Sequence, residues 1–347
     1  MQEYVMGNGA IALGALAAGV NLVAGYPGTP SSEILETISK YRHDGVYIEW
    51  SVNEKAAMEV AAAAAYSGAR AMVTMKQVGL NVAADPLMSL AYVGVKGGMV
   101  IVSADDPGPI SSQTEQDTRR FADFCRIPVF DPSSPEEAYK MIGDAFEYSE
   151  KYNTPVLFRP TTRVCHAYAS IDNCDSPSPK KYEGFVKDSK KWVIFPRLSF
   201  ANHIMIEKRN VEIGKDFSTY SANKAEGRNS EKAVVTSGIS YAYTKECLKD
   251  YPDVKLIKIA TAYPFPEDFV LSSLEGTKEV LCIEELSPFI EEQILKLTGK
   301  HGLQLKVSGK LDGKVQAGGE NSTDKIAAIL GEFFCLLYTS DAADDLI

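Results

Sequence analysis

The sequence predicts an α/β protein in which a doubly wound parallel sheet is followed by a second, smaller α/β domain. Over residues 1–168, short apolar runs typical of buried strands alternate with helical stretches of about 10–15 residues. Such alternation is typical of a parallel sheet with helices on both faces. A second series of the same kind begins at Lys232, and 347 residues are enough for about two domains with cores of their own.

The elements expected in the first domain, residues 1–168, follow the apolar pattern and its interruptions. The segment YPGTP (26–30) ends the first apolar strand, because two prolines and a glycine continue neither a strand nor a helix. Ser31 or Ser32 is expected to cap the helix that follows. In chain order the sequence predicts a helix over 8–18, a strand over 22–25, a helix ending at Tyr41, a strand over 46–50, a helix over 53–67, a strand over 71–75, a helix over 80–93, a strand over 98–103, a helix over 135–148 and a strand over 156–159.

The second half of the chain is expected to begin with a linker over residues 169–231. The segment SPSP (176–179) has the composition of a linker, and residues 176–232 hold 12 Lys and Arg against 7 Asp and Glu, the reverse of the chain as a whole. We interpret this stretch as a solvated crossover that lies against an acidic domain surface. A domain over 232–334 follows, with strands over 233–236, 254–259, 280–284 and 303–307 and helices after Gly238, Pro266 and Ser287. Residues 335–347 break the helical register of 325–334 and resemble translated adapter read-through, so we expect a non-native tail there.

Composition argues against several classes of function. The net charge of -10, from 36 Lys and Arg against 46 Asp and Glu, argues against nucleic acid or an anionic membrane as the main partner. The six cysteines show no Cys-x-x-Cys spacing, so we expect reduced thiols and neither disulfides nor a local metal or iron–sulfur site. The apolar stretches are shorter than a bilayer span and no basic-then-apolar leader opens the chain, so we expect a cytoplasmic location.

Two segments carry the strongest signal for chemistry. Residues 25–33 have the pattern of a strand end, a tight turn and a helix start, and residues 51–57 end another strand at Glu54, which opens an Ala-rich helix. The carboxyl ends of parallel strands meet at one sheet edge, where ligands bind. A carboxylate in such a crevice is partly desolvated and suited to proton chemistry. Thiamine diphosphate enzymes need this group beside N1′ of the aminopyrimidine, because a hydrogen bond there favours the tautomer that removes the C2 proton.

Two other interpretations of these segments stay open on the sequence. Ser51-Val52-Asn53-Glu54 also matches a capping box, in which Glu54 would only reach back to the Ser51 N–H. Gly7-x-Gly9-x-x-Ala12 matches the relaxed dinucleotide fingerprint, although only a short stretch precedes it and no acidic residue ends the next strand. Helix packing and a cap at Asn8 would explain these glycines as well.

Four motifs together give the chain a family resemblance: MGNGAIA (6–12), GYPGTPSSE (25–33), EWSVNEK (49–55) and KQVGLNVAADP (76–86). They resemble motifs of the 2-oxoacid:ferredoxin oxidoreductases, and most of all the α subunits that act on indolepyruvate. VTSGISY (235–241) and IEELSPFIEE (283–292) extend the resemblance to roughly residues 4–334. It implies a pyrimidine-binding thiamine diphosphate domain over 1–168 and a transketolase C-terminal-like domain over 232–334.

The resemblance also implies roles for individual residues. Glu54 matches the glutamate that activates the cofactor, and Thr29, next to Gly28, matches the threonine near the carboxylate and carbonyl of the 2-oxoacid. The loop that lines the cofactor crevice is matched by Lys76, Gln77, Val78 and Gly79.

Arg119, in the segment SSQTEQDTR (111–119), is expected to anchor the substrate carboxylate. A guanidinium pairs with a carboxylate through two parallel hydrogen bonds, which suits this task. A surface salt bridge is the alternative interpretation of this arginine.

Two features expected of the family are missing from the sequence. It holds no Gly-Asp-Gly…Asn motif for Mg²⁺ and the diphosphate and no cysteine cluster, and its only Gly-Asp is Gly143-Asp144 in an expected helix. We therefore expect an N-terminal fragment of the α subunit, inactive alone. The resemblance implies that the full-length protein binds thiamine diphosphate with Mg²⁺ and 4Fe-4S clusters, assembles with a β subunit, and uses 2-oxoacid, CoA and ferredoxin to form acyl-CoA. The alternative is a stand-alone pyrimidine-domain subunit of a split enzyme, which needs a partner for catalysis.

Overall fold

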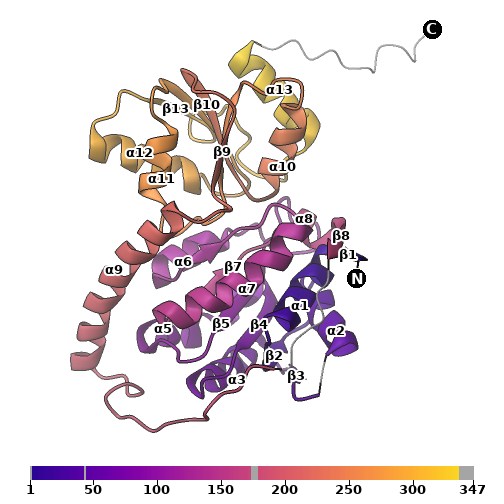
Figure 1. Cartoon of the computed structure of the whole chain (residues 1–347), viewed down its shortest axis with the longest axis vertical. Helices are drawn as coiled ribbons and strands as arrows, with labels where there is room; N and C mark the ends of the chain where they lie inside the picture. The colour runs from indigo at the N-terminus through magenta and orange to yellow at the C-terminus, as the bar shows by residue number, and fades with distance from the viewer. Residues whose placement is uncertain (1, 43, 173–178, 336–347) are drawn as a thin grey trace.

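A computed structural model of the chain describes residues 2–42, 44–172 and 179–335. Two mainly parallel sheets, one in each half of the chain, form its framework (Figure 1). The predicted α/β class, with a doubly wound sheet followed by a smaller α/β unit, is confirmed. Residues 336–347 of the expected tail and 173–178 of the expected linker lie outside the described residues.

The first sheet has six strands in the order β3-β2-β4-β5-β7-β6, and every neighbouring pair is parallel. All six carboxyl ends therefore lie at one edge of the sheet. Its strands are β2 (Leu22–Gly25), β3 (Tyr47–Trp50), β4 (Ala71–Lys76), β5 (Met99–Ala104), β6 (Val129–Phe130) and β7 (Val156–Phe158). The helices of this half are α1 (Gly7–Ala17), α2 (Ser32–Tyr41), α3 (Glu54–Tyr66), α4 (Gln77–Val82), α5 (Ala84–Val93), α6 (Thr118–Cys125), α7 (Pro135–Tyr152) and α8 (Thr162–His166).

Helices cover both faces of this sheet. Successive residues of a strand point to opposite faces, so each strand contributes side chains to two cores. Met72 packs in a core with α1, α2 and α7, whereas Val73 packs in a second core with α3, α5 and α6. Near-continuous apolar strands are what burial on both faces requires, and all of β5 is buried.

A separate antiparallel ribbon, which the sequence analysis missed, lies beside the first sheet. It pairs β1 (Gln2–Met6) with β8 (Tyr168–Asp172). Because β1 is not a strand of the parallel sheet, Gly7 does not follow a Rossmann strand, and the dinucleotide interpretation is wrong. Gly7 is needed for packing instead, since a Cβ there would lie 1.9 Å from the carbonyl oxygen of Val164.

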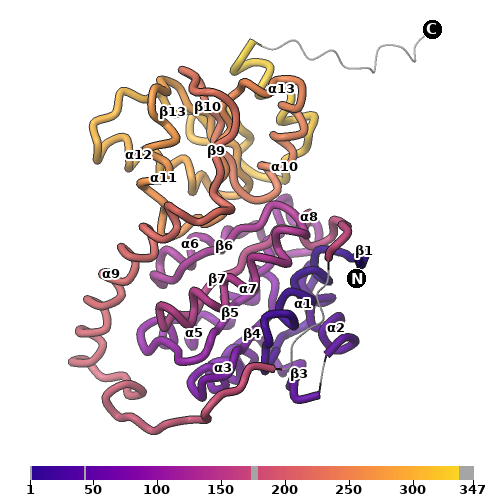
Figure 2. Tube along the Cα trace, in the orientation of Figure 1, coloured from indigo at the N-terminus to yellow at the C-terminus, as the bar shows by residue number. Residues whose placement is uncertain are grey.

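The segment expected as a linker, 169–231, contains more structure than its composition indicates. Residues 179–195 form a long connection along the first half of the chain (Figure 2). They lead into α9 (Pro196–Ser218), and β9 (Lys224–Glu226) then joins the second sheet. The buried side of α9 consists of Ile206, Asn210, Ile213 and Phe217. This stripe is narrow and holds an asparagine, which is why the basic composition hid the helix.

The second sheet has the order β13-β12-β10-β11-β9, with β9 antiparallel to β11 and the other pairs parallel. Its other strands are β10 (Lys232–Ser237), β11 (Lys255–Ile259), β12 (Glu279–Ile283) and β13 (Lys306–Ser308). Its helices are α10 (Gly238–Cys247), α11 (Glu267–Ser273), α12 (Phe289–His301) and α13 (Thr323–Phe334).

The two sheets meet through a buried guanidinium, that of Arg119, which is fully buried. It lies in the first turn of α6, pairs with Asp117 at 2.6 Å, and reaches into the second domain to Glu284 at 2.8 Å and to the carbonyl oxygens of Glu285 and Ser287. The expected substrate anchor is therefore wrong, because every nitrogen of the guanidinium already donates to the protein. The surface salt bridge is wrong as well.

Around Arg119 lies an ion cluster, which we call the interdomain cluster. It consists of two guanidiniums and five carboxyl groups: Arg119, Arg159, Asp105, Asp117, Asp131, Glu284 and Glu285. Two cations do not balance five buried carboxylates, so burial leaves part of the set easier to protonate. Burial raises the pKa of Asp105 to about 6 and that of Glu285 to about 7. Burial would also raise the pKa of Asp117, but its contact with Arg119 outweighs burial and lowers the pKa to about 2.

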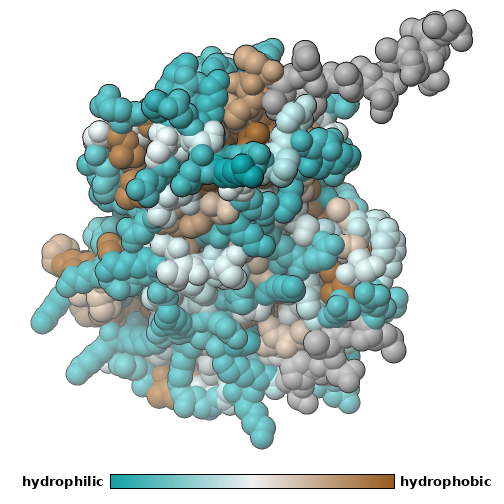
Figure 3. All heavy atoms as spheres, turned by 45° about the horizontal axis from the view of Figure 1, so that its top comes forward, coloured by the Kyte–Doolittle hydropathy of each residue, from teal (hydrophilic) through white to brown (hydrophobic). Residues whose placement is uncertain are grey.

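The face in Figure 3 is mostly hydrophilic, with hydrophobic patches that are separate from one another. Within the described residues, no helix combines the length and apolar character needed to cross a bilayer.

We expect Arg119→Met to lower the free energy of unfolding by about 3–5 kcal/mol, because it leaves buried carboxylates without their cation. Urea denaturation measures this difference. Arg120→Met is the matched control, since Arg120 pairs with Glu292 at 2.6 Å while both side chains are about one-third exposed. An exposed pair contributes about 0–1 kcal/mol. An equal loss in the two variants would contradict the role given to Arg119.

The raised pKa of Glu285 predicts a pH-dependent effect of Glu285→Gln. The folded protein holds a proton there that the unfolded chain releases above a pKa of about 4.3, so this group lowers stability as pH rises toward 7. The glutamine oxygen can still accept the Asn321 N–H, which lies 2.9 Å from the Glu285 carboxylate. The variant should melt higher than wild type at pH 8 and at a similar temperature at pH 5. The same difference at both pH values would refute the assignment.

Candidate functional site

The candidate site lies at the carboxyl ends of β3, β2 and β4, which are neighbours in the first sheet. Gly25, the last residue of β2, is level with Trp50 of β3 and Thr74 of β4. The chain leaves these three strands at residues 26–31, 51–53 and 77. The motifs that the sequence analysis selected in residues 25–33, 51–57 and 76–79 therefore lie at one edge.

Glu54 is the first residue of α3, and Asn53 caps this helix by accepting the Ala56 N–H at 2.9 Å. The Ser51 N–H, which a capping box would assign to Glu54, instead donates to the carbonyl oxygen of Gly25 at 2.9 Å. The capping-box interpretation of Glu54 is therefore wrong. The Glu54 carboxylate therefore has no role in capping α3.

The Glu54 side chain is only 8% exposed and has no hydrogen-bond or ion-pair partner in the described part of the chain. It lies directly over Gly79 of α4, where a Cβ atom would be 2.5 Å from Oε1 of Glu54. A side chain at position 79 would displace the carboxylate. Gly79 thus provides the space that Glu54 occupies, and a nearly buried carboxyl group without a protein partner is available to hydrogen-bond a ligand atom.

The segment 76–79 is not the loop that the resemblance implied. Lys76 ends β4, and α4 begins at Gln77, so Gln77, Val78 and Gly79 form the first helical turn. The helix expected from residue 80 is two helices, α4 and α5, which meet at Ala83. This brings Gly79 under Glu54 and fixes Gln77, which is fully buried and donates to the carbonyl oxygen of Thr114 at 3.2 Å.

The turn after β2 packs against Lys76. A Cβ on Gly28 would lie 3.1 Å from Cγ and Cδ of Lys76, so the glycine lets the lysine stem cross the turn. Ser32 and Ser31 support Gly28 through its N–H at 2.8 Å and its carbonyl oxygen at 3.0 Å. Neither serine hydroxyl caps α2, contrary to expectation. Thr29 follows Gly28 and is exposed at the same edge.

Asn8 is a supporting residue to which the sequence analysis gave a different role. It does not cap α1 but lies inside this helix, fully buried, and donates to the carbonyl oxygen of Pro30 at 2.7 Å and to Glu33 at 2.9 Å. It therefore holds the end of the turn that carries Thr29. The available signal was an amide in a helix otherwise made of Gly, Ala, Ile and Leu.

The segment 106–117 adds a fourth side to the site. Asp106 accepts the Ser111 N–H at 2.9 Å and the Thr162 hydroxyl at 2.7 Å, and the Ser111 hydroxyl donates to the Thr29 carbonyl oxygen at 3.2 Å. Burial alone would raise the pKa of Asp106, but these hydrogen bonds outweigh it and hold the pKa below its usual value. Asp106 thus stays ionised and anchors this segment beside Thr29.

These residues fit one half of a thiamine diphosphate. The unpartnered Glu54 carboxylate suits the aminopyrimidine nitrogen, Gly79 gives this carboxylate its space, and Gly28 gives space to the Lys76 stem. Among the described residues, no group of three or more His, Cys, Asp and Glu could hold a metal ion.

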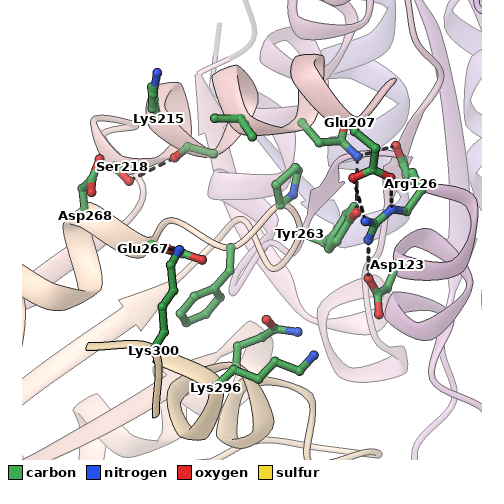
Figure 4. A pocket seen from close by; sticks show the side chains of 16 residues that line it. Asp123, Arg126, Glu207, Lys215, Ser218, Tyr263, Glu267, Asp268, Lys296 and Lys300 are labelled. Atoms are coloured by element: carbon green, nitrogen blue, oxygen red, sulfur yellow. Dashed lines mark hydrogen bonds and ion pairs between the residues drawn. The ribbon is translucent and has the colours of Figure 1, made fainter. Parts of the chain in front are cut away.

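A groove of about 410 Å³ lies elsewhere, between α6, α9, α11 and α12 (Figure 4). On one side Arg126 pairs with Glu207 at 2.9 Å and with Asp123 at 3.4 Å, and Lys300 pairs with Glu267 across the groove. These ion pairs engage five of the eight charged side chains that line the groove. None of the predicted site residues lines it.

Comparison with known proteins shows which family the chain belongs to. Residues 13–226 match the family described as pyruvate flavodoxin/ferredoxin oxidoreductase, thiamine diphosphate-binding. The chain is 42% identical over 315 residues to indolepyruvate oxidoreductase subunit IorA of Thermococcus kodakarensis, covering 88% of this chain and 49% of that protein. It is 26% identical over 358 residues to 2-oxoglutarate synthase subunit KorA of Methanocaldococcus jannaschii, covering 89% of this chain and 96% of that subunit.

Among solved structures, a 2-oxoglutarate:ferredoxin oxidoreductase from Magnetococcus marinus has the same fold, with a TM-score of 0.75 and 15% identity over 95% of this chain and 65% of that one. The chain spans about half the length of the IorA proteins that it matches. The family match covers more than half of the chain, including Glu54 and Gly79. The chain therefore belongs to the pyruvate flavodoxin/ferredoxin oxidoreductase family and carries its thiamine diphosphate-binding domain.

Proposed function

We propose that the chain supplies the pyrimidine-binding half of a thiamine diphosphate site in an oxidoreductase that acts on 2-oxoacids. The substrate class that we propose is an aryl pyruvate such as indolepyruvate, which is converted with CoA to an acyl-CoA while ferredoxin is reduced. The observation that carries the proposal is the Glu54 carboxylate, which is nearly buried at the sheet edge and has no protein partner among the described residues. Gly79 has no side chain and so leaves the space that this carboxylate occupies.

When bound, thiamine diphosphate supplies carbanion stabilisation during decarboxylation. The chain's own part is to hold a proton at the Glu54 carboxyl group and share it with a ring nitrogen of the cofactor. Gly28, Thr29, Lys76, Gln77, Val78 and Gly79 are proposed to line the crevice. Thr29 is proposed to contact the 2-oxoacid, since it is exposed beside the lysine stem that crosses Gly28.

The rest of the assembly is proposed from the relatives. IorA and KorA are both named as subunits, which supports a hetero-oligomer with a β subunit and with ferredoxin as the electron acceptor. We propose that Mg²⁺, the diphosphate and 4Fe-4S clusters are held by parts of the enzyme beyond this chain. We also propose that the enzyme is located in the cytoplasm.

A second candidate is a stand-alone subunit of a split enzyme. It is favoured by KorA, a subunit that matches this chain over 96% of its own length. An immunoblot of source cells with antibody against residues 1–334 separates the candidates. A polypeptide of this length supports the split enzyme, and one about twice as long supports an IorA-like subunit.

We expect Glu54→Gln to lower turnover of a 2-oxoacid by roughly 10²–10⁴-fold in the complete enzyme, because the amide cannot exchange a proton with the cofactor. The melting temperature should change little, since Asn53 rather than Glu54 caps α3. Turnover and thermal unfolding are measured on the same preparation. Asn53→Ala is the control, and it should lose about 0.5–2 kcal/mol of stability. Wild-type turnover in Glu54→Gln would refute the proposed function.

Gly79→Ala should reduce turnover on the order of 10–100-fold, because the added methyl group would displace the Glu54 carboxylate from its position. Gly143→Ala in α7 is a matched control, since the nearest atom to its added Cβ would be 4.0 Å away. Both variants exchange a helical glycine for alanine, so they differ in what the methyl group meets. Equal activity in the two would show that the position of Glu54 is not critical.

A further inference from the structure

Lys76 lies at the same sheet edge as Glu54 and has no carboxylate partner among the described residues. Its aliphatic stem crosses Gly28, only Gln77 and Val78 lie between it and Gly79, and no ion pair of the described residues includes it. Its ammonium donates to Oε1 of Gln113 at 3.4 Å, which is a long contact. An ammonium has three donors, so most of its capacity is free. The side chain is only partly buried, and its charge faces the sheet edge without a counter-ion.

The other cations near this edge are already paired. Lys55, next to Glu54, pairs with Asp85 at 2.7 Å. Arg119 is fully buried, and its nitrogens are held by Asp117, Glu284 and carbonyl oxygens of the second domain. The expected carboxylate anchor is therefore not available at Arg119. A substrate carboxylate at this edge would still need a cation, because an unpaired anion in a partly desolvated crevice is costly.

We propose that Lys76 binds the carboxylate of the 2-oxoacid. This inference rests on the proposed function and assigns a specificity residue to it. Three observations place the ammonium on the substrate side of the crevice. The stem of Lys76 passes over the turn next to Thr29, β2 and β4 are adjacent, and Gln113 belongs to the segment that Ser111 ties to the Thr29 carbonyl oxygen.

The Gln113 amide oxygen has a defined part in this arrangement. It is neutral, so it orients the ammonium without neutralising it, whereas a carboxylate there would compete with the substrate. Gln77, the residue after Lys76, contacts the same segment by donating to the Thr114 carbonyl oxygen at 3.2 Å and accepting the Ser112 hydroxyl at 3.4 Å. The segment 111–114 therefore fixes both the strand end and the direction of the lysine.

The test compares Lys76→Met, Lys76→Arg and Lys55→Met in the complete enzyme assembled with its partner subunits. Indolepyruvate turnover gives KM and kcat, and calorimetry with Mg²⁺ gives the Kd of thiamine diphosphate. We expect Lys76→Met to raise KM at least about tenfold, the size of a lost charge-assisted hydrogen bond. The Kd of the cofactor should stay within about twofold, and Lys76→Arg should recover part of the loss. Lys55→Met removes the same charge at the same edge and should leave KM unchanged.

Each outcome decides one question. A KM of Lys76→Met within twofold of an active wild type would overturn the assignment while leaving the proposed function intact. A tenfold weaker Kd for thiamine diphosphate at unchanged KM would also overturn it, and would assign Lys76 to the cofactor. An equal rise of KM in Lys55→Met would attribute the effect to general charge at the edge and overturn the inference. A correctly assembled wild type that turns over no 2-oxoacid would refute the proposed function itself.

Discussion

The rest of the structure depends on the burial of the Arg119 guanidinium between the two sheets. A parallel sheet places all its polar strand ends at one edge, and here the ends of β5, β6 and β7 meet those of β10 and β12. Such an edge is rich in carboxylates, so it would repel a second carboxylate-rich edge. Arg119 makes the contact favourable by pairing with Asp117 on one side and Glu284 on the other, and Arg159 pairs with Asp105 and Asp131 of the first half. Surplus carboxyl groups are left with raised pKa values.

This arrangement also constrains the candidate site. The segment from Asp105 to Thr118 begins at the end of β5 and ends at α6, and Asp105 accepts both the N–H and the hydroxyl of Thr118. Its two ends are thus fixed in the interdomain cluster. Its middle, at Ser111, contacts the turn that carries Thr29. The position of Thr29 therefore depends on buried charges in another part of the protein, and Asn8 holds the same turn at Pro30.

The sequence was sufficient where a signal is local. Leu22–Gly25 and the turn after it were predicted correctly because apolar runs and prolines act within a few residues, and parallel-sheet logic then brought Glu54, Gly28 and Gly79 to one edge. The sequence was insufficient where the interaction partner of a residue lies far away along the chain. Nothing near Arg119 indicates Glu284, 165 residues away, so an arginine in a polar segment looked available for substrate. The same holds for α9, whose buried stripe becomes visible only when its packing partners are known.

The edge around Glu54 carries exposed apolar side chains beside the nearly buried carboxylate. Among the described residues, β3 is the outermost strand on its side of the sheet. Tyr26 follows β2 and is 39% exposed, whereas Trp50 ends β3 and is 41% exposed. Val52, which follows β3, is 84% exposed. Apolar side chains beside a nearly buried carboxylate favour contact with another surface over solvation. A cofactor shared between this edge and a second surface would cover these side chains and would give the Glu54 carboxylate a hydrogen-bond partner. A sheet edge that needs a second surface to cover its apolar side chains thus supports the proposal that this chain supplies only half of the thiamine diphosphate site.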